Sequence, residues 1–579
     1  MDIKNLIVKE YLESLTERNE LNYIFPMLLE AMGFNVLSKP TEFVGLSEYG
    51  KDIVAVGVDP EDNVKRRFYF ELKGGADRDI TQKNFYGDDG IQQSLTEASY
   101  NKFVSAFPEF ENLPLKIVIV HNGIIKGNVQ PTFESFLTNL QSLNPQISYD
   151  RWDISRLTVY FSEKLFGAYL LVDTRTTRLF NRALLNLNVT DGISKDYFEL
   201  LDILLGEQWT PTKKISRKWQ LLFGSLKLIG FVIYTESKEY NNLEIAKRYC
   251  THLLIKFWHW ILKNKLEENK NVVIYFDQIL KQYFQILTEY FQRTIPIATL
   301  KDGVFSEFAG RYEQIGFTKR TFEYLEYFTF FYTIVRYYDK KHDASMLTTL
   351  IKIINQNTVS ARPLIDHHSV AIVSILNLFI ECNNIESARN YLSAVIGSII
   401  YAKEKYDMLP DANNHIENVI RFTVTGSKPV YYSDSTSPLL AVMFEYLAIL
   451  DMESEYLRLR DFVKKHEIEL GVFVPFTGKN SSALHLVTDK ENDLDEQLFS
   501  KSVNDGYQSG LSLTKNFSEE LTFPDFKNKI EKRKSEFEYD YRTDKAGYPF
   551  LRNLAHIYFM TPYFPDKWRN IGSITQVKE

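Results

Sequence analysis

The sequence predicts an α/β domain with a mixed sheet over residues 1–165, followed by a large all-α region with the paired-helix character of an α-solenoid. Three observations support this. Helical and strand patterns alternate over the first 165 residues, whereas apolar residues recur at helical spacing in long segments beyond about residue 190. The length, 579 residues, exceeds one ordinary domain. We expect three parts: residues 1–165, a helical region 166–475, and residues 476–579, which begin with a long polar loop at 476–520.

The elements of the first part follow from local patterns. Leu21, Ile24 and Leu28 recur at helical spacing before Gly33, which predicts a first helix, and Pro26 should kink or break it. A polar turn at residues 59–63 separates two strand patterns and so predicts a hairpin. The remaining elements expected here are strands at 52–58, 65–73, 115–121 and 147–153, and helices at 90–105, 131–142 and from about 155.

The second part reads as helix after helix, with polar joints that carry Gly, Pro or Asn. The pattern shows no fixed period, so it does not predict a strict repeat array. The expected helices are 195–206, 216–236, 243–265, 271–293, 320–339, 366–381, 384–405 and 436–466.

Charge is unevenly distributed along the chain. Residues 1–165 hold 17 Lys and Arg against 24 Asp and Glu, a net of −7, and the other residues hold 51 of each sign. An acidic domain is not a simple DNA-binding module, because such modules present a basic face. Clustered carboxylates can nevertheless hold a cation that meets phosphate. The acidity therefore leaves a metal-dependent site open.

Cellular location is constrained by what the sequence lacks. No apolar run approaches the ~18–20 residues that cross a bilayer, and the first residues lack the apolar core of a signal peptide. Cys250 and Cys382 are too few for a disulfide framework or a structural zinc site. We expect a cytoplasmic protein without membrane contact.

The hairpin holds the residues most suited to chemistry. If residues 60–63 form its loop, the positions of each opposed pair sum to 123, which sets Asp52 opposite Glu71. Alternation along the strand puts Lys73 on the same face as Glu71, while Phe70 points to the core. Two carboxylates and a lysine should then converge, although a one-residue slip would separate them.

Two opposed carboxylates suit a hard cation such as Mg²⁺ or Mn²⁺, with positions left for water and a phosphate oxygen. A neighbouring ammonium can hold the attacking water and offset charge on the phosphorane. The alternative interpretation is an ordinary ion pair, because an acid two residues before a lysine is a common strand pattern.

A series of motifs surrounds this hairpin: Met32-Gly-Phe34 at a helix end, then Gly50-Lys-Asp-Ile53, Phe70-Glu-Leu-Lys-Gly-Gly75, a helix with Gln92-Gln93-Ser-Leu95, and the apolar strand Ile117–Val120. Their order resembles the PD-(D/E)XK, restriction-endonuclease-like nuclease family. The resemblance covers residues 17–121, under a fifth of the chain. Lys51 stands where the proline of the family's name would be.

The resemblance implies roles for particular residues. Asp52 and Glu71 would ligate the metal, and Lys73 would position water. An acid on the first helix often joins them, with Glu20 the best match and Glu17 the second. A glutamine on the later helix often assists, which implies Gln93 or Gln92.

Together these features predict a metal-dependent endonuclease acting on nucleic acid, DNA rather than RNA, with a helical regulatory region. Nuclease domains fused to helical regions resemble bacterial anti-phage defence effectors, an analogy of architecture. We expect a homo-oligomer and an activating protein or ligand at the helical region. The alternatives are an RNA-directed nuclease and a non-catalytic helical scaffold or sensor whose nuclease-like domain binds without cutting.

Two further sequence signals each have a functional and a structural interpretation. The basic stretch with Lys213, Lys214, Arg217 and Lys218 either contacts phosphate or is a solvated helix face. The triplet Asp366-His367-His368 matches the signature of DHH phosphoesterases, but it opens an apolar helical run, which favours an N-cap aspartate with two first-turn histidines.

Overall fold

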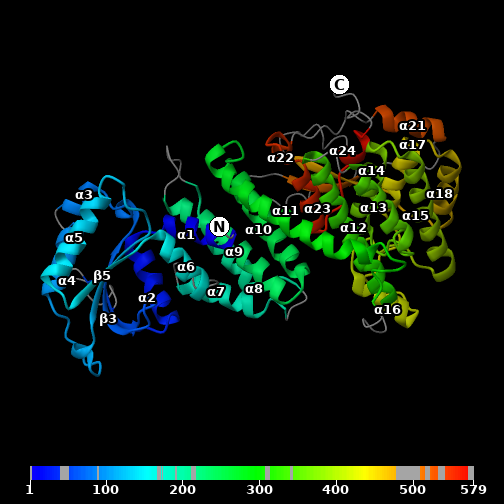
Figure 1. Cartoon of the computed structure of the whole chain (residues 1–579). Coiled ribbons are helices and arrows are strands. Elements are labelled where there is room, and N and C mark those ends of the chain that lie inside the picture. Colours follow the sequence, from blue (N-terminus) through cyan, green and yellow to red (C-terminus); the bar gives the residue numbers. More distant parts are fainter. Residues whose placement is uncertain are drawn as a thin grey trace. The chain divides into compact units, whose positions relative to one another are not determined.

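A computed structural model of the chain describes residues 3–38, 51–87, 90–165, 171, 174–188, 192–209, 217–306, 313–338, 343–477, 509–514, 522–532 and 541–571. The chain divides into two compact units, residues 1–286 and residues 287–579. Figure 1 labels the elements of both units along the sequence.

A five-stranded mixed sheet forms the centre of the α/β part of the first unit. Its strands lie in chain order, β1 beside β2, then β3, β4 and β5. The pairs β1–β2 and β2–β3 are antiparallel, while β3–β4 and β4–β5 are parallel. The predicted mixed sheet is therefore confirmed. The bounds are Asn35–Ser38, Ile53–Val58, Lys65–Lys73, Leu115–His121 and Ile147–Trp152.

Helices surround this sheet and continue beyond it in the first unit. A π-helical turn at Glu17–Leu21 joins α1 to α2, and α11 (Lys270–Ala298) extends past the division at residue 286. Helix α1 packs on both α6 and α9. The bounds are α1 Ile3–Ser14, α2 Asn22–Ala31, α3 Gln82–Tyr86, α4 Ile91–Tyr100, α5 Gln130–Leu143, α6 Ile154–Lys164, α7 Thr174–Leu185, α8 Lys195–Leu204, α9 Arg217–Glu239 and α10 Leu243–Lys263.

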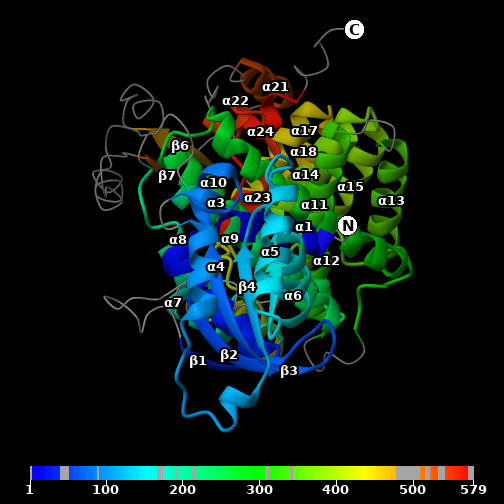
Figure 2. The ribbon, with the colours of Figure 1, turned by 60° about the vertical axis from the view of Figure 1, so that its left-hand side comes forward.

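Both faces of the sheet are covered. Helices α3, α4 and α5 cover one face (Figure 2), where Tyr69 and Ile117 pack with Phe133. The other face carries an aromatic cluster, in which the ring of Phe25 on α2 lies 5.3 Å from that of Phe70. Alternation along β3 thus sends successive side chains into two cores. Tyr69 is 1% exposed, so the Glu71 face is as buried as the Phe70 face.

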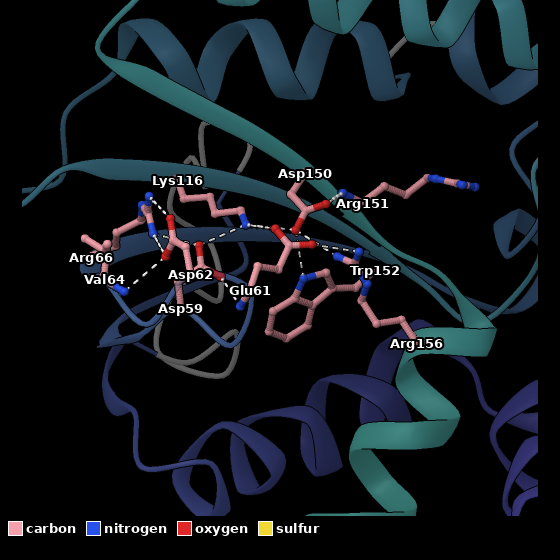
Figure 3. Close-up of polar contacts among 10 residues, drawn as sticks. All are labelled: Asp59, Glu61, Asp62, Val64, Arg66, Lys116, Asp150, Arg151, Trp152 and Arg156. Carbon is pink, nitrogen blue, oxygen red and sulfur yellow. Dashed lines mark hydrogen bonds and ion pairs between the residues drawn. The ribbon is translucent and has the colours of Figure 1, made fainter.

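A buried ion-pair network ties the hairpin to the parallel strands (Figure 3). The ammonium of Lys116 on β4 lies 2.9 Å from Asp59, 2.7 Å from Glu61 and 3.0 Å from Asp150. Arg156 on α6 pairs with both Glu61 and Asp150, at 2.8 and 2.9 Å. The side chains of Lys116 and Asp59 are only 5% and 2% exposed, so water hydrates them little. The attraction between the opposite charges has to compensate for that lost hydration.

The second unit is mainly helical, as predicted. The structure corrects the expected loop at 476–520, because Ser509–Thr514 (β7) pairs antiparallel with Val472–Thr477 (β6); residues 478–508 lie outside the described part. The helices are α12 Glu313–Tyr338, α13 Asp343–Gln356, α14 Ser369–Glu381, α15 Ile385–Tyr406, α16 Ile416–Thr425, α17 Pro438–Ile449, α18 Glu453–Lys465, α21 Phe523–Lys532, α22 Arg542–Lys545, α23 Phe550–Phe559 and α24 Asp566–Arg569.

None of the helices in the described ranges is both long enough and apolar enough to span a bilayer.

Candidate active site

The candidate site lies where β2 begins and β3 ends. The register of the hairpin is the predicted one, since Ile53 pairs with Phe70 and Val58 with Lys65, and both pairs sum to 123. Asp52 directly precedes β2, and its N–H donates to the carbonyl of Phe70 at 2.9 Å. In that register the N–H of Asp52 would point away from β3, so its bond to Phe70 shows that the regular pairing ends at Ile53. Asp52 is nevertheless close enough to Glu71 for the charge of Glu71 to act on its carboxyl.

Contacts among the three side chains are close. The ammonium of Lys73 donates to Oε1 of Glu71 at 2.8 Å, and Oδ2 of Asp52 accepts a hydrogen bond from the backbone N–H of Leu72 at 2.6 Å. Glu71 is 5% exposed. Asp52 and Lys73 are half-buried. The acids therefore lie under partial cover, where each charge acts strongly on the next.

The electrostatics follow from this crowding. Burial, and then the negative charge of Glu71, raise the pKa of Asp52 well above its usual value, against the Leu72 hydrogen bond and the charge of Lys73. Burial opposes the charge of Lys73, but the charge and hydrogen bond of Glu71 outweigh it, so the pKa of Lys73 is raised. Lys73 is accordingly a fixed cation, and the charge of Glu71 disfavours the ionised form of Asp52.

Of the two first-helix acids, Glu17 is the one whose charge acts on both Asp52 and Lys73. Its backbone packs on the end of β3, because a Cβ added to Gly74 would lie 2.7 Å from the N of Glu17. Only glycine allows this approach. Glu20, the acid that the sequence favoured, has its Oε2 2.5 Å from the backbone N–H of Thr16, from which it accepts a hydrogen bond.

The glutamine expected to assist lies on α4 but faces outward. Gln93 is exposed, and its amide donates to Oε1 of Glu97, one turn later, at 2.8 Å. Gln92 is half-buried. The structure therefore connects Gln93 to Glu97 rather than to the carboxylate pair.

Lys51 is a residue that the sequence reasoning missed. It is 5% exposed, its ammonium lies 5.4 Å from the ring centroid of Tyr69, and the charges of Glu97 and Glu71 act on it. Burial outweighs those charges and lowers the pKa of Lys51. Its place directly before Asp52 was visible in the sequence, but the direction of its side chain was not, because Lys51 precedes the regular strand.

Two carboxylates fit a hard divalent cation. Mg²⁺ is commonly held by one or two protein carboxylates, with water and phosphate oxygens as the other ligands. Asp52 and Glu71 offer that set, and the repulsion that raises the pKa of Asp52 is what a cation would relieve. In the part of the chain that the structure describes, no three His, Cys, Asp or Glu side chains gather to hold a metal by themselves. Substrate and water would have to complete the coordination.

The basic stretch of the sequence is only partly covered by the structure. Lys213 and Lys214 lie outside the described residues, as does the side chain of Arg217, which begins α9. Lys218 is exposed and pairs with Glu207. Its neighbour Trp219 is buried, with its ring 5.0 Å from that of Trp209. The stretch is therefore anchored by its tryptophan, and its phosphate contacts stay a prediction.

A second basic surface, on α7, was not anticipated. Arg175, Arg178 and Arg182 line a hollow of about 430 Å³. Arg175 pairs with Glu199 at 2.8 Å, whereas Arg178 is exposed and pairs with none of the described residues. The hydroxyl of Thr174, at the start of α7, lies 3.3 Å from that of Tyr23 on α2. The start of α7 therefore lies beside α2.

The triplet Asp366-His367-His368 is structural. It forms a buried 3₁₀ turn before α14, and Asp366 does not cap that helix as expected. Instead its Oδ1 accepts a hydrogen bond from Ser437, the N-cap of α17, at 3.0 Å, and it also accepts one from the N–H of Leu439 in the first turn of that helix. His368 stacks on Phe322, with ring centroids 4.0 Å apart. A DHH active site is therefore not supported.

Burial makes Asp366 a source of pH-dependent stability. Burial, and then the charge of Asp411, raise the pKa of Asp366 to about 8, against the hydrogen bonds from Ser437 and Leu439. A raised folded-state pKa means that the folded protein binds this proton more tightly, so stability falls as pH rises from about 4 to about 8. Asp366→Asn should raise the free energy of unfolding at pH 8 by about 2 kcal/mol. Chemical denaturation at pH 5 and pH 8 measures this.

The matched control for that experiment is Asp62→Asn. Hydrogen bonds from Arg66 and from the Val64 N–H lower the pKa of Asp62 to about 2, so its stabilising effect is complete above pH 4. The control should not gain stability at pH 8. Equal stability of Asp366→Asn and wild type at both pH values would show that Asp366 is not protonated on folding.

Comparison with known proteins adds no family to this geometry. No family model, no curated protein and no solved structure matches the chain.

Proposed function

We propose that the protein is a metal-dependent nuclease that hydrolyses phosphodiester bonds, most readily in DNA, at Asp52, Glu71 and Lys73. The observation that supports the proposal is the closeness of the three charges, because the ammonium of Lys73 lies 2.8 Å from Glu71 and the charges of Glu71 and Lys73 both act on Asp52. The carboxylates would hold Mg²⁺ or Mn²⁺, which supplies charge neutralisation and an acidified water. Lys73 would hold the water or the phosphate oxygen as a permanent cation. Glu17 would act on the site through its charge, which reaches both Asp52 and Lys73.

The helical architecture beyond the sheet supports a role in bacterial defence against phage, as the sequence analogy suggested, with an activator acting on the helical region. The first test is direct. Purified protein is incubated with plasmid DNA and with structured RNA, in Mg²⁺, in Mn²⁺ or in EDTA. Cleavage of DNA that EDTA abolishes supports the proposal, and cleavage of RNA alone supports the RNA-directed alternative.

A non-catalytic binding module is the second candidate, and one observation favours it. The described residues hold no three-ligand metal cluster, and Glu71 is 5% exposed, which restricts access. Nucleic acid that is bound but not cut in either metal, by a protein whose Asp52→Ala variant binds equally well, would support this candidate over the nuclease.

Electrostatic attraction to nucleic acid should come from residues outside the acidic region 1–165. The net charge of −7 over residues 1–165 repels a polyanion. We predict that replacing Arg178 by alanine lowers affinity similarly for all sequences and reduces the salt slope of binding by about 1. Fluorescence anisotropy in EDTA at several salt concentrations measures both quantities without cleavage.

The same assay compares two basic surfaces. The variant Lys213→Ala, Lys214→Ala, Arg217→Ala, Lys218→Ala tests the stretch before α9, and Arg175→Ala, Arg178→Ala, Arg182→Ala tests α7. The surface whose loss flattens the salt slope more is the one that contacts phosphate. Wild-type slopes in both variants would assign these cations to helix solvation.

A further inference from the structure

A large cavity in the second unit is used by none of the functions above. Its volume is about 1160 Å³, and it lies among the start of α12, the chain after α13, α15 and α16. Pockets for small organic ligands commonly enclose about 300–1,000 Å³. The cavity is therefore large enough for such a ligand and still has room for water.

The floor and the rim of the cavity differ in character. Ile315, Val419 and Phe422 are buried and form an apolar floor. At the rim, Tyr401 is 54% and Tyr406 55% exposed. Exposed aromatic rings above an apolar hollow offer flat surfaces on which a ring system can stack.

The charged side chains at the rim of the cavity are cations, and the acid in its lining is already hydrogen-bonded. Arg362 lines the cavity, is exposed, and forms no ion pair with a described residue. Lys405 stands over the ring of Tyr401, 5.1 Å from its centroid, and donates to its hydroxyl at 2.6 Å. The acid in the lining, Asp302, is engaged, because its Oδ1 accepts hydrogen bonds from the N–H and hydroxyl of Thr358.

We propose that this cavity binds a small organic anion with a flat apolar ring system. Arg362 would pair with the anionic group, Tyr401 and Tyr406 would stack on the rings, and the floor would receive the apolar edge. The guanidinium is suited to this because it binds carboxylate, sulfonate and phosphate oxygens through two parallel N–H groups. The inference concerns residues 287–579 alone and does not depend on the nuclease proposal.

Two probes separate the charge from the rings. 8-Anilinonaphthalene-1-sulfonate carries the ring system and an anion, and N-phenyl-1-naphthylamine carries the same rings without charge. Both become fluorescent in apolar sites. The full-length protein is titrated with each probe, and dissociation constants are compared among variants.

The variants divide the site into its parts. Arg362→Gln removes the cation and should weaken the sulfonate about tenfold while leaving the neutral probe unchanged. Gly397 lies on α15 in the cavity lining, and a Cβ built on it meets no atom within 4 Å. Gly397→Phe should therefore place a ring in the cavity, compete with the rings of both probes and weaken both of them about tenfold. Gly397→Ala is the matched control, because it adds a methyl group and keeps the volume.

The outcomes are distinct. The proposal is supported if Arg362→Gln weakens the sulfonate about tenfold but not the neutral probe, and if Gly397→Phe weakens both probes while Gly397→Ala weakens neither. Undiminished binding of both probes to Gly397→Phe would mean that they bind elsewhere and would overturn it. Equal affinity of the sulfonate for Arg362→Gln and wild type would overturn the anion assignment. Both glycine variants should fold, because alanine and phenylalanine are better helix formers than glycine. Thermal denaturation checks this.

Discussion

Glu71→Ala is expected to lower cleavage of nucleic acid by at least about 10³-fold and to leave the protein folded. The charge of Glu71 acts on Asp52, and Glu71 accepts a hydrogen bond from Lys73, so its loss would remove a proposed metal ligand and free the cation at once. Asp52→Ala and Lys73→Ala should have effects of similar size. The triple variant should be hardly worse than any single one, because the three groups act as a unit. Initial rates on plasmid DNA in Mg²⁺ measure each variant.

Glu111→Ala is the matched control for these variants. Glu111 lies in the same domain, is 57% exposed at its side chain, and pairs with Arg67 on β3 at 2.8 Å, away from the carboxylate pair. It should keep wild-type rates. Robust Mg²⁺-dependent cleavage by Glu71→Ala would contradict the site assignment and favour the binding-module candidate. Unchanged melting temperatures exclude unfolding as the cause of lost activity.

Lys116→Met is expected to destabilise the protein by about 3 kcal/mol. Lys116 is 5% exposed at its side chain and neutralises Asp59, Glu61 and Asp150 together (Figure 3). Methionine keeps the length of the chain but leaves buried carboxylates with less compensation, and that desolvation cost is what the free energy of unfolding reports. Urea denaturation measures it.

The control is a lysine of the same domain in an exposed pair. Lys126 lies 2.8 Å from Asp79 and is 46% exposed at its side chain. Lys126→Met should cost no more than about 1 kcal/mol, because solvent screens such pairs. Equal effects of the two substitutions would show that the network of Lys116 contributes no more than a surface ion pair.

The hairpin shows how far the sequence alone could lead. Its register follows from loop length and alternation, and because both of these features are local, they were enough to predict the pairing from Ile53–Phe70 to Val58–Lys65. Strands β3 and β4 begin and end at the expected residues, 65–73 and 115–121. The helix expected at 90–105 ends at Tyr100 instead, and the N–H of Phe103 beyond it donates to the hydroxyl of Tyr69. That contact is tertiary and has no local signal.

The sequence alone could not decide between Glu17 and Glu20, and the reason is physical. Glu20 was preferred for its distance in sequence from Gly33, although a kink or break was expected at Pro26. The structure keeps Pro26 inside α2 but places a π-helical turn before it, with the N–H of Leu21 bonded to the carbonyl of Thr16 at 2.8 Å. Such a turn contains one residue more than an α-helical turn, so positions before it shift around the axis. The count therefore favoured Glu20, whereas the charge of Glu17 is the one that acts on Asp52.

The apolar pattern of the sequence also failed to predict two short strands. Strand β1 has four residues and β7 six, and both are defined by their partners rather than by their own alternation. Lys51 likewise owes its position to packing against Tyr69.

The π-helical turn also makes the site sensitive to chain length. Each residue of an α-helix advances the chain by about 100° around the axis, so losing one residue from Glu17–Leu21 would restore a regular helix and swing Glu17 by roughly that angle relative to α2. A single-codon deletion there would therefore act like a point mutation of the acid itself, and homologous chains with and without the extra residue should differ in activity while sharing a fold.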